Sequence, residues 1–269
     1  MIKLAHIVNP VIVPPSSDLH IAQPITFETM RIAQAFAADC LTVSLFSAQY
    51  AEDRSIVPDA FQLTPDLDRS VQDVGLFQKP RKLPLIADIL DRLYAATDAE
   101  YLIYTNVDIA LMPSFYLTVK AAIDQGYDAF AINRRTISKT YSNLSELPLM
   151  FAEVGTPQGG HDCFIFRRDV YPKYLLGNAC IGAAKIGKVL LLNLMIHSKR
   201  FFEFCDWYLT FHLGNDRAWK ALELQDYFNH NEGELIRIFR HYADSKPLID
   251  HPQMQKLIDR YLPAGQQIS

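Results

Sequence analysis

The segment EYLIYTNVDIALMPSFY (residues 100–116) places two polar residues where an apolar strand should end. Its apolar run is typical of a buried strand, yet Asn106 and Asp108 interrupt it before it resumes. Residues two apart in a strand point to the same side, so we expect these two side chains to converge on one spot. Open α/β sheets bind ligands beyond the carboxyl ends of their strands, which makes this strand end a candidate binding site.

Asp108 and Asn106 offer different chemistry at that position. A carboxylate can hold a hard divalent cation such as Mg²⁺ or Mn²⁺ and leave coordination positions for diphosphate oxygens. The amide of Asn106 is both donor and acceptor, which suits a ribose hydroxyl or a water better than strong metal binding. Asn and Asp also begin many turns, so a turn without a ligand is the simpler interpretation of an isolated pair.

Hydrophobic periodicity around this segment predicts an α/β fold. Apolar strands alternate with helices that have one apolar face, which indicates a mostly parallel central sheet with helices on both faces and a helical C-terminal tail. Thr26 is the expected N-cap of the first helix, whose apolar face would include Phe36. Residues 48–80 are polar and lack periodicity, so we expect a loop there. Strands are predicted at 3–8, 41–47, 101–109, 127–134 and 162–169, and helices at 25–38, 83–97 and 114–126.

Composition and missing motifs exclude several classes of protein. A net charge of −4 argues against a broad surface for nucleic acid, and no apolar run approaches the roughly 20 residues of a membrane span. Four scattered cysteines without a CxxC pair, and an N-terminus unlike a signal peptide, predict a cytoplasmic protein. The first strand ends without the glycine pattern of a dinucleotide-binding sheet or a P-loop. No G-x-S-x-G, HExxH or EF-hand motif occurs.

The strand end resembles the D-x-D motif of glycosyltransferases with the GT-A fold. In that family an apolar strand ends in an acid-x-acid pair that binds the metal and the diphosphate of a nucleotide sugar. YLIYTNVDIAL (101–111) has this layout, with Asp108 at the final acid and Asn106 in place of the first. The resemblance implies a GT-A-like fold, a Mn²⁺ or Mg²⁺ cofactor bound through Asp108, and a nucleotide-sugar donor.

A second segment, YLTFHLGNDRAW (208–219), extends the resemblance. GT-A enzymes often supply a histidine or an acid from this part of the chain to complete the metal site. His212 is similar to that ligand, and Asp216 is a weaker candidate. A histidine packed among aromatic side chains is the alternative, because lone core histidines are also common.

A third segment, GGHDCFIFRRD (159–169), begins a strand with His161 and Asp162. In inverting GT-A enzymes an acid in this region deprotonates the acceptor hydroxyl. The resemblance therefore implies Asp162 as the catalytic base, with His161 orienting the acceptor or tuning the acid. A turn Asp at the start of a strand is the alternative.

Candidate nucleotide contacts lie in two other parts of the sequence. In transferases of this family the loop after the first strand holds the base and ribose, which implies contacts from Asn9 and Pro10. QKPRKLP (78–84) places Lys82 and other cations before the helix that precedes the key strand, where they can meet a diphosphate. INRRTISK (132–139) adds two arginines near the same expected edge. A solvated basic face is the alternative for both clusters.

These features predict a metal-dependent glycosyltransferase of the hexosyltransferase class that moves a sugar from a nucleotide donor to a hydroxyl-bearing acceptor. We expect one domain, with a nucleotide-binding half (1–110), an acceptor-side half (111–220) and C-terminal helices (221–269). A sugar nucleotidyltransferase is an alternative, although its usual glycine-rich arginine loop is missing after the first strand. A non-catalytic nucleotide- or sugar-binding protein is another, because Asn106 replaces an acid.

Overall fold

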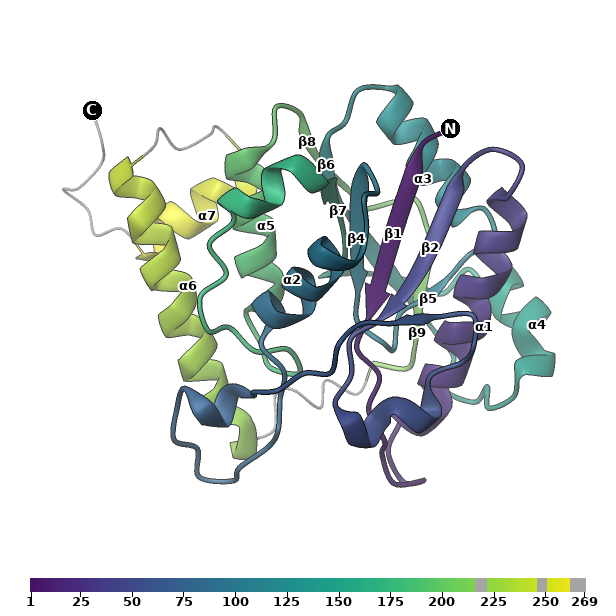
Figure 1. Ribbon diagram of the computed structural model, residues 1–269, viewed down its shortest axis with the longest axis horizontal. Coiled ribbons are helices and arrows are strands. Elements are labelled where there is room, and N and C mark those ends of the chain that lie inside the picture. Colours follow the sequence, from purple (N-terminus) through teal and green to yellow (C-terminus); the bar gives the residue numbers. More distant parts are fainter. Residues whose placement is uncertain (216–221, 246–250, 262–269) are drawn as a thin grey trace.

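The computed structural model describes residues 1–215, 222–245 and 251–261, which form a central sheet between two layers of helices (Figure 1). The sheet has nine strands among these residues, in the order β3-β2-β1-β4-β7-β6-β9-β5, with β8 paired to β6. The strands are β1 (Lys3–Val8), β2 (Thr42–Ser47), β3 (Gln62–Leu63), β4 (Tyr101–Thr105), β5 (Ala110–Leu111), β6 (Ala129–Ile137), β7 (Thr156–Arg167), β8 (Phe201–Phe204) and β9 (Thr210–Leu213). The α-helices are α1 (Leu19–Ala37), α2 (Ile86–Ala96), α3 (Phe115–Asp124), α4 (Leu147–Ala152), α5 (Ile186–His197), α6 (Gln225–Ser245) and α7 (Pro252–Tyr261).

Strand pairing brings several carboxyl ends to one edge of the sheet. β1 pairs in parallel with β2 and β4, and β2 pairs in parallel with β3. β7 runs antiparallel between β4 and β6, so β6 has the direction of β4. β8 and β9 pair in parallel with successive parts of β6, and β5 is antiparallel to β9. The predicted mostly parallel sheet is therefore confirmed, and β1, β2, β4 and β6 end at the same edge.

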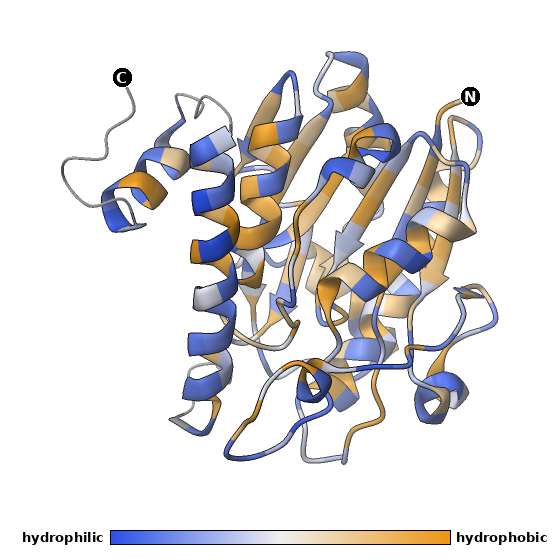
Figure 2. Cartoon of the chain, turned by 60° about the vertical axis from the view of Figure 1, so that its left-hand side comes forward, coloured by the Kyte–Doolittle hydropathy of each residue, from blue (hydrophilic) through white to orange (hydrophobic). Residues whose placement is uncertain are grey.

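Alternate residues of each strand face two different helical layers. Ala5 and Ile7 of β1 belong to a core cluster with side chains of α2 and α5, onto which α6 and α7 also pack. Leu4 and Val8 belong to a second cluster with side chains of α1 and α3. Figure 2 shows hydrophobic strands between helices that carry many hydrophilic residues on their outer faces. No helix in the described part of the chain is both long and apolar enough to cross a membrane.

The first helix begins earlier than predicted. α1 begins at Leu19, and Thr26 is a fully buried residue inside it and not its N-cap. Pro24 also lies inside α1, where its missing N–H forfeits a bond to the carbonyl group of His20 in the first turn. The helix tolerates the loss of this hydrogen bond because the bond lies near the N-terminus of α1. Phe36, which we expected on the apolar face, is 59% exposed.

β4 ends before the polar pair instead of continuing to residue 109. The strand stops at Thr105, and the N–H of Ile109 donates to the carbonyl oxygen of Asn106 across a tight turn at 3.1 Å. Asn106 and Asp108 therefore belong to this turn, and strand alternation does not set their directions. β6 and β7 are longer than predicted, because they pair with each other beyond their apolar centres.

His6 fixes the position of the turn. Its ring is fully buried between β4 and α3, with Nε2 2.9 Å from the hydroxyl oxygen of Thr105 and Nδ1 2.9 Å from that of Tyr116. Burial lowers the pKa of His6 to about 3, so the ring is neutral near pH 7. The last residue of β4 is thereby tied to β1 and α3, which holds the start of the turn in place.

Gly155→Ala should destabilise the β6–β7 pairing. Gly155 has a φ of +66°, and a Cβ there would lie 2.4 Å from the carbonyl oxygen of Thr136 on β6. We expect the free energy of unfolding to fall by about 2 kcal/mol, because both the backbone conformation and the contact penalise a side chain. No described residue lies within 4 Å of a Cβ at Gly159, so Gly159→Ala should change the free energy of unfolding by less than about 0.5 kcal/mol. Denaturant unfolding measures both variants, and equal stabilities would contradict this account.

Candidate functional site

Asp108 and His212 meet at the carboxyl edge of the sheet. β5 begins two residues after Asp108 and pairs with β9, with Ala110 opposite Phe211. This register brings Nε2 of His212 to 3.2 Å from Oδ2 of Asp108. The two residues predicted as metal ligands are therefore in direct contact, although they come from distant parts of the chain.

The ring of His212 has a defined orientation. Its Nδ1 lies 2.8 Å from the carbonyl oxygen of Gly214, which can only accept, so Nδ1 carries a proton. A second proton on Nε2 makes the ring an imidazolium that donates to the carboxylate of Asp108. Loss of that proton leaves a lone pair on Nε2, directed toward the same carboxylate. The positive charge beside Asp108 therefore depends on the protonation of Nε2.

The pKa values of Asp108 and His212 move apart. Burial alone would lower the pKa of His212, but the hydrogen bond to Asp108 and its negative charge raise that pKa above its ordinary value. Burial alone would raise the pKa of Asp108, but the hydrogen bond and charge of His212, with the charge of Arg134, hold it below its ordinary value. The ion pair therefore stabilises the fold between the folded-state pKa of Asp108 and that of His212. Its contribution is lost below and above this window.

Asp162 forms a second charged group at the same edge. It precedes Cys163, which pairs with Thr105 at the end of β4. Nη1 of Arg134 donates to Oδ2 of Asp162 at 2.6 Å, and the amide nitrogen of Asn106 approaches Oδ1 at 3.3 Å. Both charged side chains are mostly buried, at 16% and 14% exposed. Asn106 thus contacts Asp162 at the position where D-x-D strands carry an acid.

The basicity of Asp162 is set by its surroundings. Burial raises the pKa of this carboxyl, the charge of Arg134 lowers it in part, and the charge of Asp108 raises it further. The net result is a pKa above the ordinary value. A carboxylate with a raised pKa is a stronger base, which is the property that proton abstraction from a hydroxyl requires.

His161 has a different partner, which the sequence analysis missed. Nε2 of His161 lies 2.9 Å from Oε1 of Glu203 on β8, and Glu203 also accepts from Asn133 at 3.2 Å and from Gln253 of α7 at 3.1 Å. Burial raises the pKa of Glu203, but the hydrogen bond and charge of His161 and the two amide donors lower it to about 2. The sequence feature that could have pointed to Glu203 is the presence of an acid inside the aromatic run FFEF (201–204).

Three predicted nucleotide contacts lie near the ends of β1 and β2. Asn9 and Pro10 directly follow β1 and are both buried. The amide nitrogen of Asn9 donates to the backbone carbonyl that follows β2 at 2.6 Å, which ties the two strand ends together. Lys82 lies over the ring of Tyr50, 3.8 Å from its centroid, and pairs with Glu52.

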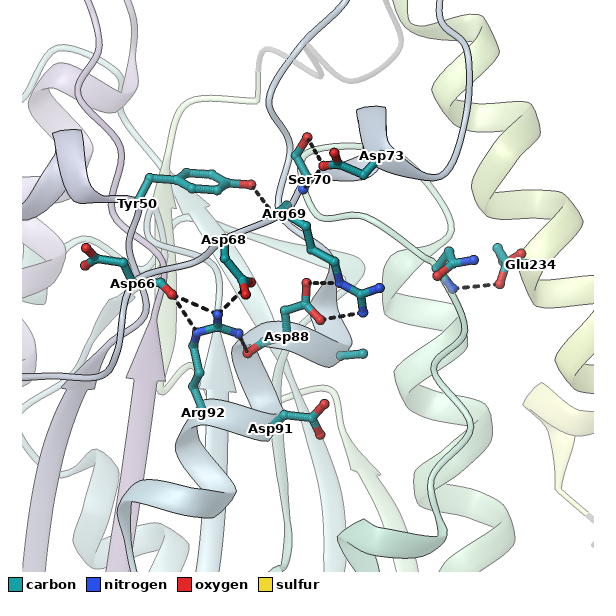
Figure 3. Close-up of polar contacts among 12 residues, drawn as sticks. Tyr50, Asp66, Asp68, Arg69, Ser70, Asp73, Asp88, Asp91, Arg92 and Glu234 are labelled. Carbon is teal, nitrogen blue, oxygen red and sulfur yellow. Dashed lines mark hydrogen bonds and ion pairs between the residues drawn. The ribbon is translucent and has the colours of Figure 1, made fainter.

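Two arginines fix the segment after β2 to α2. Figure 3 shows Arg92 against Asp66 and Asp68, and Arg69 facing Asp88. Arg92 donates to the backbone carbonyl of Asp66 at 2.8 Å and to the carboxylate of Asp68 at 3.0 Å. Arg69 donates to both carboxylate oxygens of Asp88 at 2.9 and 2.7 Å. The bidentate contact of Arg69 and the two contacts of Arg92 hold residues 66–69 against α2.

The two basic clusters of the sequence have different positions. Lys79 and Arg81 both pair with Glu223, outside the cluster of Asp108 and Asp162. Arg135 is buried and donates to backbone carbonyl groups, including that of Tyr208 at 3.1 Å. Arg134 is the member of these clusters that contacts Asp162.

The site offers two protein ligands to a metal ion. Within the described residues no group of three or more His, Cys, Asp and Glu side chains could hold one. Oδ1 of Asp108 is buried and has no hydrogen-bond partner in the described part of the chain, so this oxygen has an unused lone pair. A cation at Asp108 and His212 would take its remaining ligands from a bound molecule or water. Asp216, the weaker predicted ligand, lies outside the described residues.

No family model matches the sequence, and no curated protein sequence matches it. Solved structures match its fold. TarS of S. aureus is similar over 96% of this chain and 42% of the TarS chain, with a TM-score of 0.56 and 10% identity. TarS 1–349 in complex with UDP matches 96% of this chain and 70% of that chain, with a TM-score of 0.57 and 11% identity.

A third structure, TarS 1–349 in complex with UDP-GlcNAc, matches 99% of this chain and 78% of that one, with a TM-score of 0.51 and 9% identity. The present chain thus spans less than half of the first TarS chain. At sequence identities of 9 to 11%, the structural similarity shows the fold alone. The chain has the GT-A-like fold predicted from its D-x-D-like strand.

Asp108→Asn should lower the pKa of His212. Removing the negative charge leaves burial, which disfavours the imidazolium, without its main opposing interaction. NMR titration of the His212 ring protons should show the midpoint moving to lower pH. Asp98→Asn is the control, since Asp98 is exposed and pairs with Lys3. An unchanged midpoint in Asp108→Asn would show that the two side chains do not interact in solution.

Proposed function

We propose that the protein is a divalent-metal-dependent glycosyltransferase that moves a hexosyl group from a nucleotide-sugar donor to a hydroxyl-bearing acceptor. The observation that carries this proposal is the contact of Asp108 with His212 at the carboxyl edge of a GT-A-like sheet. TarS, which has the same fold, was solved with UDP and with UDP-GlcNAc. This supports a nucleoside-diphosphate ligand for the present chain and makes uridine the first base to test.

The side chains of Asp108 and His212 fit a Mn²⁺ or Mg²⁺ ion. Asp108 has a buried oxygen that no described residue hydrogen-bonds, and Gly214 fixes the tautomer of neutral His212 that leaves the Nε2 lone pair available. Two protein ligands leave positions for phosphate oxygens, which is how such ions commonly bind with nucleotide substrates. When bound, the cation neutralises charge that develops on the departing nucleoside diphosphate.

The remaining predicted contacts would hold the rest of the donor. Asn9 and Pro10 follow β1 at the edge and would lie against the base and ribose. Asn106 has a donor and an acceptor for a ribose hydroxyl, and Lys82 supplies positive charge for the diphosphate. Each of these residues lies at the carboxyl ends of β1, β2 or β4 or in the loop that leads to α2.

Asp162 would act as the base on the acceptor side. In an inverting transfer its carboxylate takes the proton of the acceptor hydroxyl while the acceptor oxygen bonds to the sugar and the nucleoside diphosphate leaves. The raised pKa of Asp162 favours this transfer. His161, held by Glu203, would orient the acceptor.

Donor binding should be visible in a thermal-shift panel of UDP-, GDP-, ADP- and CMP-linked sugars with and without Mn²⁺. One base should raise the melting temperature only with Mn²⁺, because a ligand of the folded state stabilises it by about 2.7 kcal/mol at a hundred times Kd. The metal-dependent rise should grow with pH through the pKa of His212, since Nε2 must lose its proton before it can bind a cation.

Asp108→Ala should abolish the metal-dependent rise, whereas Asp98→Ala, which removes an exposed acid, should retain it. Survival of the rise in Asp108→Ala would refute the metal assignment. Nucleotide binding without release of nucleoside diphosphate would favour a non-catalytic binding protein. Formation of nucleotide sugar and pyrophosphate would favour a nucleotidyltransferase.

Asp162→Asn should lower the turnover number about 10²- to 10⁴-fold, the usual contribution of a general base. The measurement is nucleoside diphosphate release, with water replacing the acceptor if none is found. Donor-dependent stabilisation should persist in the variant, because Asp162 acts on the acceptor side. Asp169→Asn is the matched control, since this exposed acid follows the C-terminal end of β7 and pairs with Arg167. A similar loss in both variants would contradict the assignment.

A further inference from the structure

A cavity of about 530 Å³ lies outside the site described above. Its walls come from residues 11–13 after β1, the first part of α1, residues 56–61 and Leu144. Neither Asp108 nor Asp162 lines it. The volume is in the range of cavities that bind small molecules, which are about 300–1,000 Å³.

The walls of this cavity are mainly apolar. Phe27 and Phe61 are buried and meet edge to face, with their ring centroids 5.2 Å apart. Ile12 and Leu144 also line the cavity and are 51% and 45% exposed, respectively. Large aliphatic side chains that face both solvent and a cavity favour an apolar ligand, because such a ligand removes them from water.

Apart from His20, the polar side chains along the walls have partners among the described residues. Gln23 accepts from the N–H of Val11 and donates to its carbonyl oxygen, both at 2.9 Å. Glu28 and Arg31 form a bidentate ion pair at 2.9 and 2.6 Å. A nucleobase or a sugar needs several hydrogen bonds to offset the loss of water. With these groups engaged, the cavity suits a hydrocarbon chain better than a nucleotide or a sugar.

The loop that forms one wall is held in position without a ligand. Gln23 binds both backbone groups of Val11, and the carboxylate of Asp53 accepts from the N–H of Ile12 at 2.7 Å. These bonds tie residues 11 and 12 to α1 on one side and to the segment after β2 on the other. The cavity is therefore preformed, which reduces the cost of binding.

One position in the lining offers unused polarity. His20 is exposed at the cavity, and its imidazole can donate a hydrogen bond to a polar head group. We propose that the cavity binds the hydrocarbon chain of an amphiphilic molecule whose polar head lies against His20. A fatty acyl chain and an isoprenoid chain share this chemistry. The proposal goes beyond the transferase function and does not depend on it.

Calorimetric titration with alkyl phosphates of six to twelve carbons, and with farnesyl phosphate, tests the proposal below their micelle concentrations. We expect saturable binding of one molecule per chain, with affinity rising roughly fourfold for each added CH₂ until the cavity is full. Tighter binding of dodecyl phosphate would indicate an acyl source, and tighter binding of farnesyl phosphate an isoprenoid source. Inorganic phosphate and UDP should not compete. The absence of saturable binding, or competition by UDP, would overturn the proposal.

Two variants locate the binding to this cavity. Ala60→Trp fills it, and Ile12→Asp puts a charge in its wall, so each should weaken binding of the tighter probe at least tenfold. Ala95→Trp is the matched control on the exposed face of α2 and should bind as the native protein does. Thermal unfolding confirms that each variant is folded. Native affinity in both cavity variants would refute the site, and because no transferase assay is involved, this result is separate from any failure of the proposed function.

Discussion

The position of the turn after β4 is the constraint on which the carboxyl edge depends. His6, buried between the strand and α3, binds Thr105 and fixes where β4 ends. The next residues form the turn, so Asp108 reaches His212 and Asn106 reaches Asp162. A neutral histidine in the core therefore determines the geometry of a charged site that it does not itself touch.

Each acid at this edge has one basic partner, and the two partners differ in kind. Unpaired charges are costly to bury, so His212 and Arg134 allow Asp108 and Asp162 to remain ionised. A guanidinium keeps its charge at all ordinary pH values, whereas an imidazolium near neutrality can lose it. The counter-charge of Asp108 therefore depends on pH, and the metal ion proposed above would take its place. The Asp162 half keeps a permanent counter-charge.

The sequence was most informative where one local pattern decides the structure. The periodicity of residues 83–97 was enough to predict α2, and an acid after an apolar run was enough to select Asp108. The choice of Arg134 over its neighbour could not be predicted, because irregular register between β6 and β7 near Asn133 decides which arginine reaches Asp162. Glu203 had no spacing signal in the sequence, because its partners come from β6, β7 and α7. The start of α1 could not be predicted because Pro24, which usually interrupts a helix, lies inside it. The cavity beside α1 could not be predicted because its walls come from segments far apart in the sequence.

The strand order has a consequence for the direction in which the chain is made. β5, which follows the Asp108 turn, pairs with β9 at the end of the sheet path. A nascent chain that has not yet reached residue 210 contains β1, β2 and β4, but it has neither the partner of β5 nor His212. The Asp108 carboxylate is then solvated and uncoupled from the imidazole. Vectorial synthesis therefore produces β1, β2 and β4 before it produces the residue that Asp108 contacts.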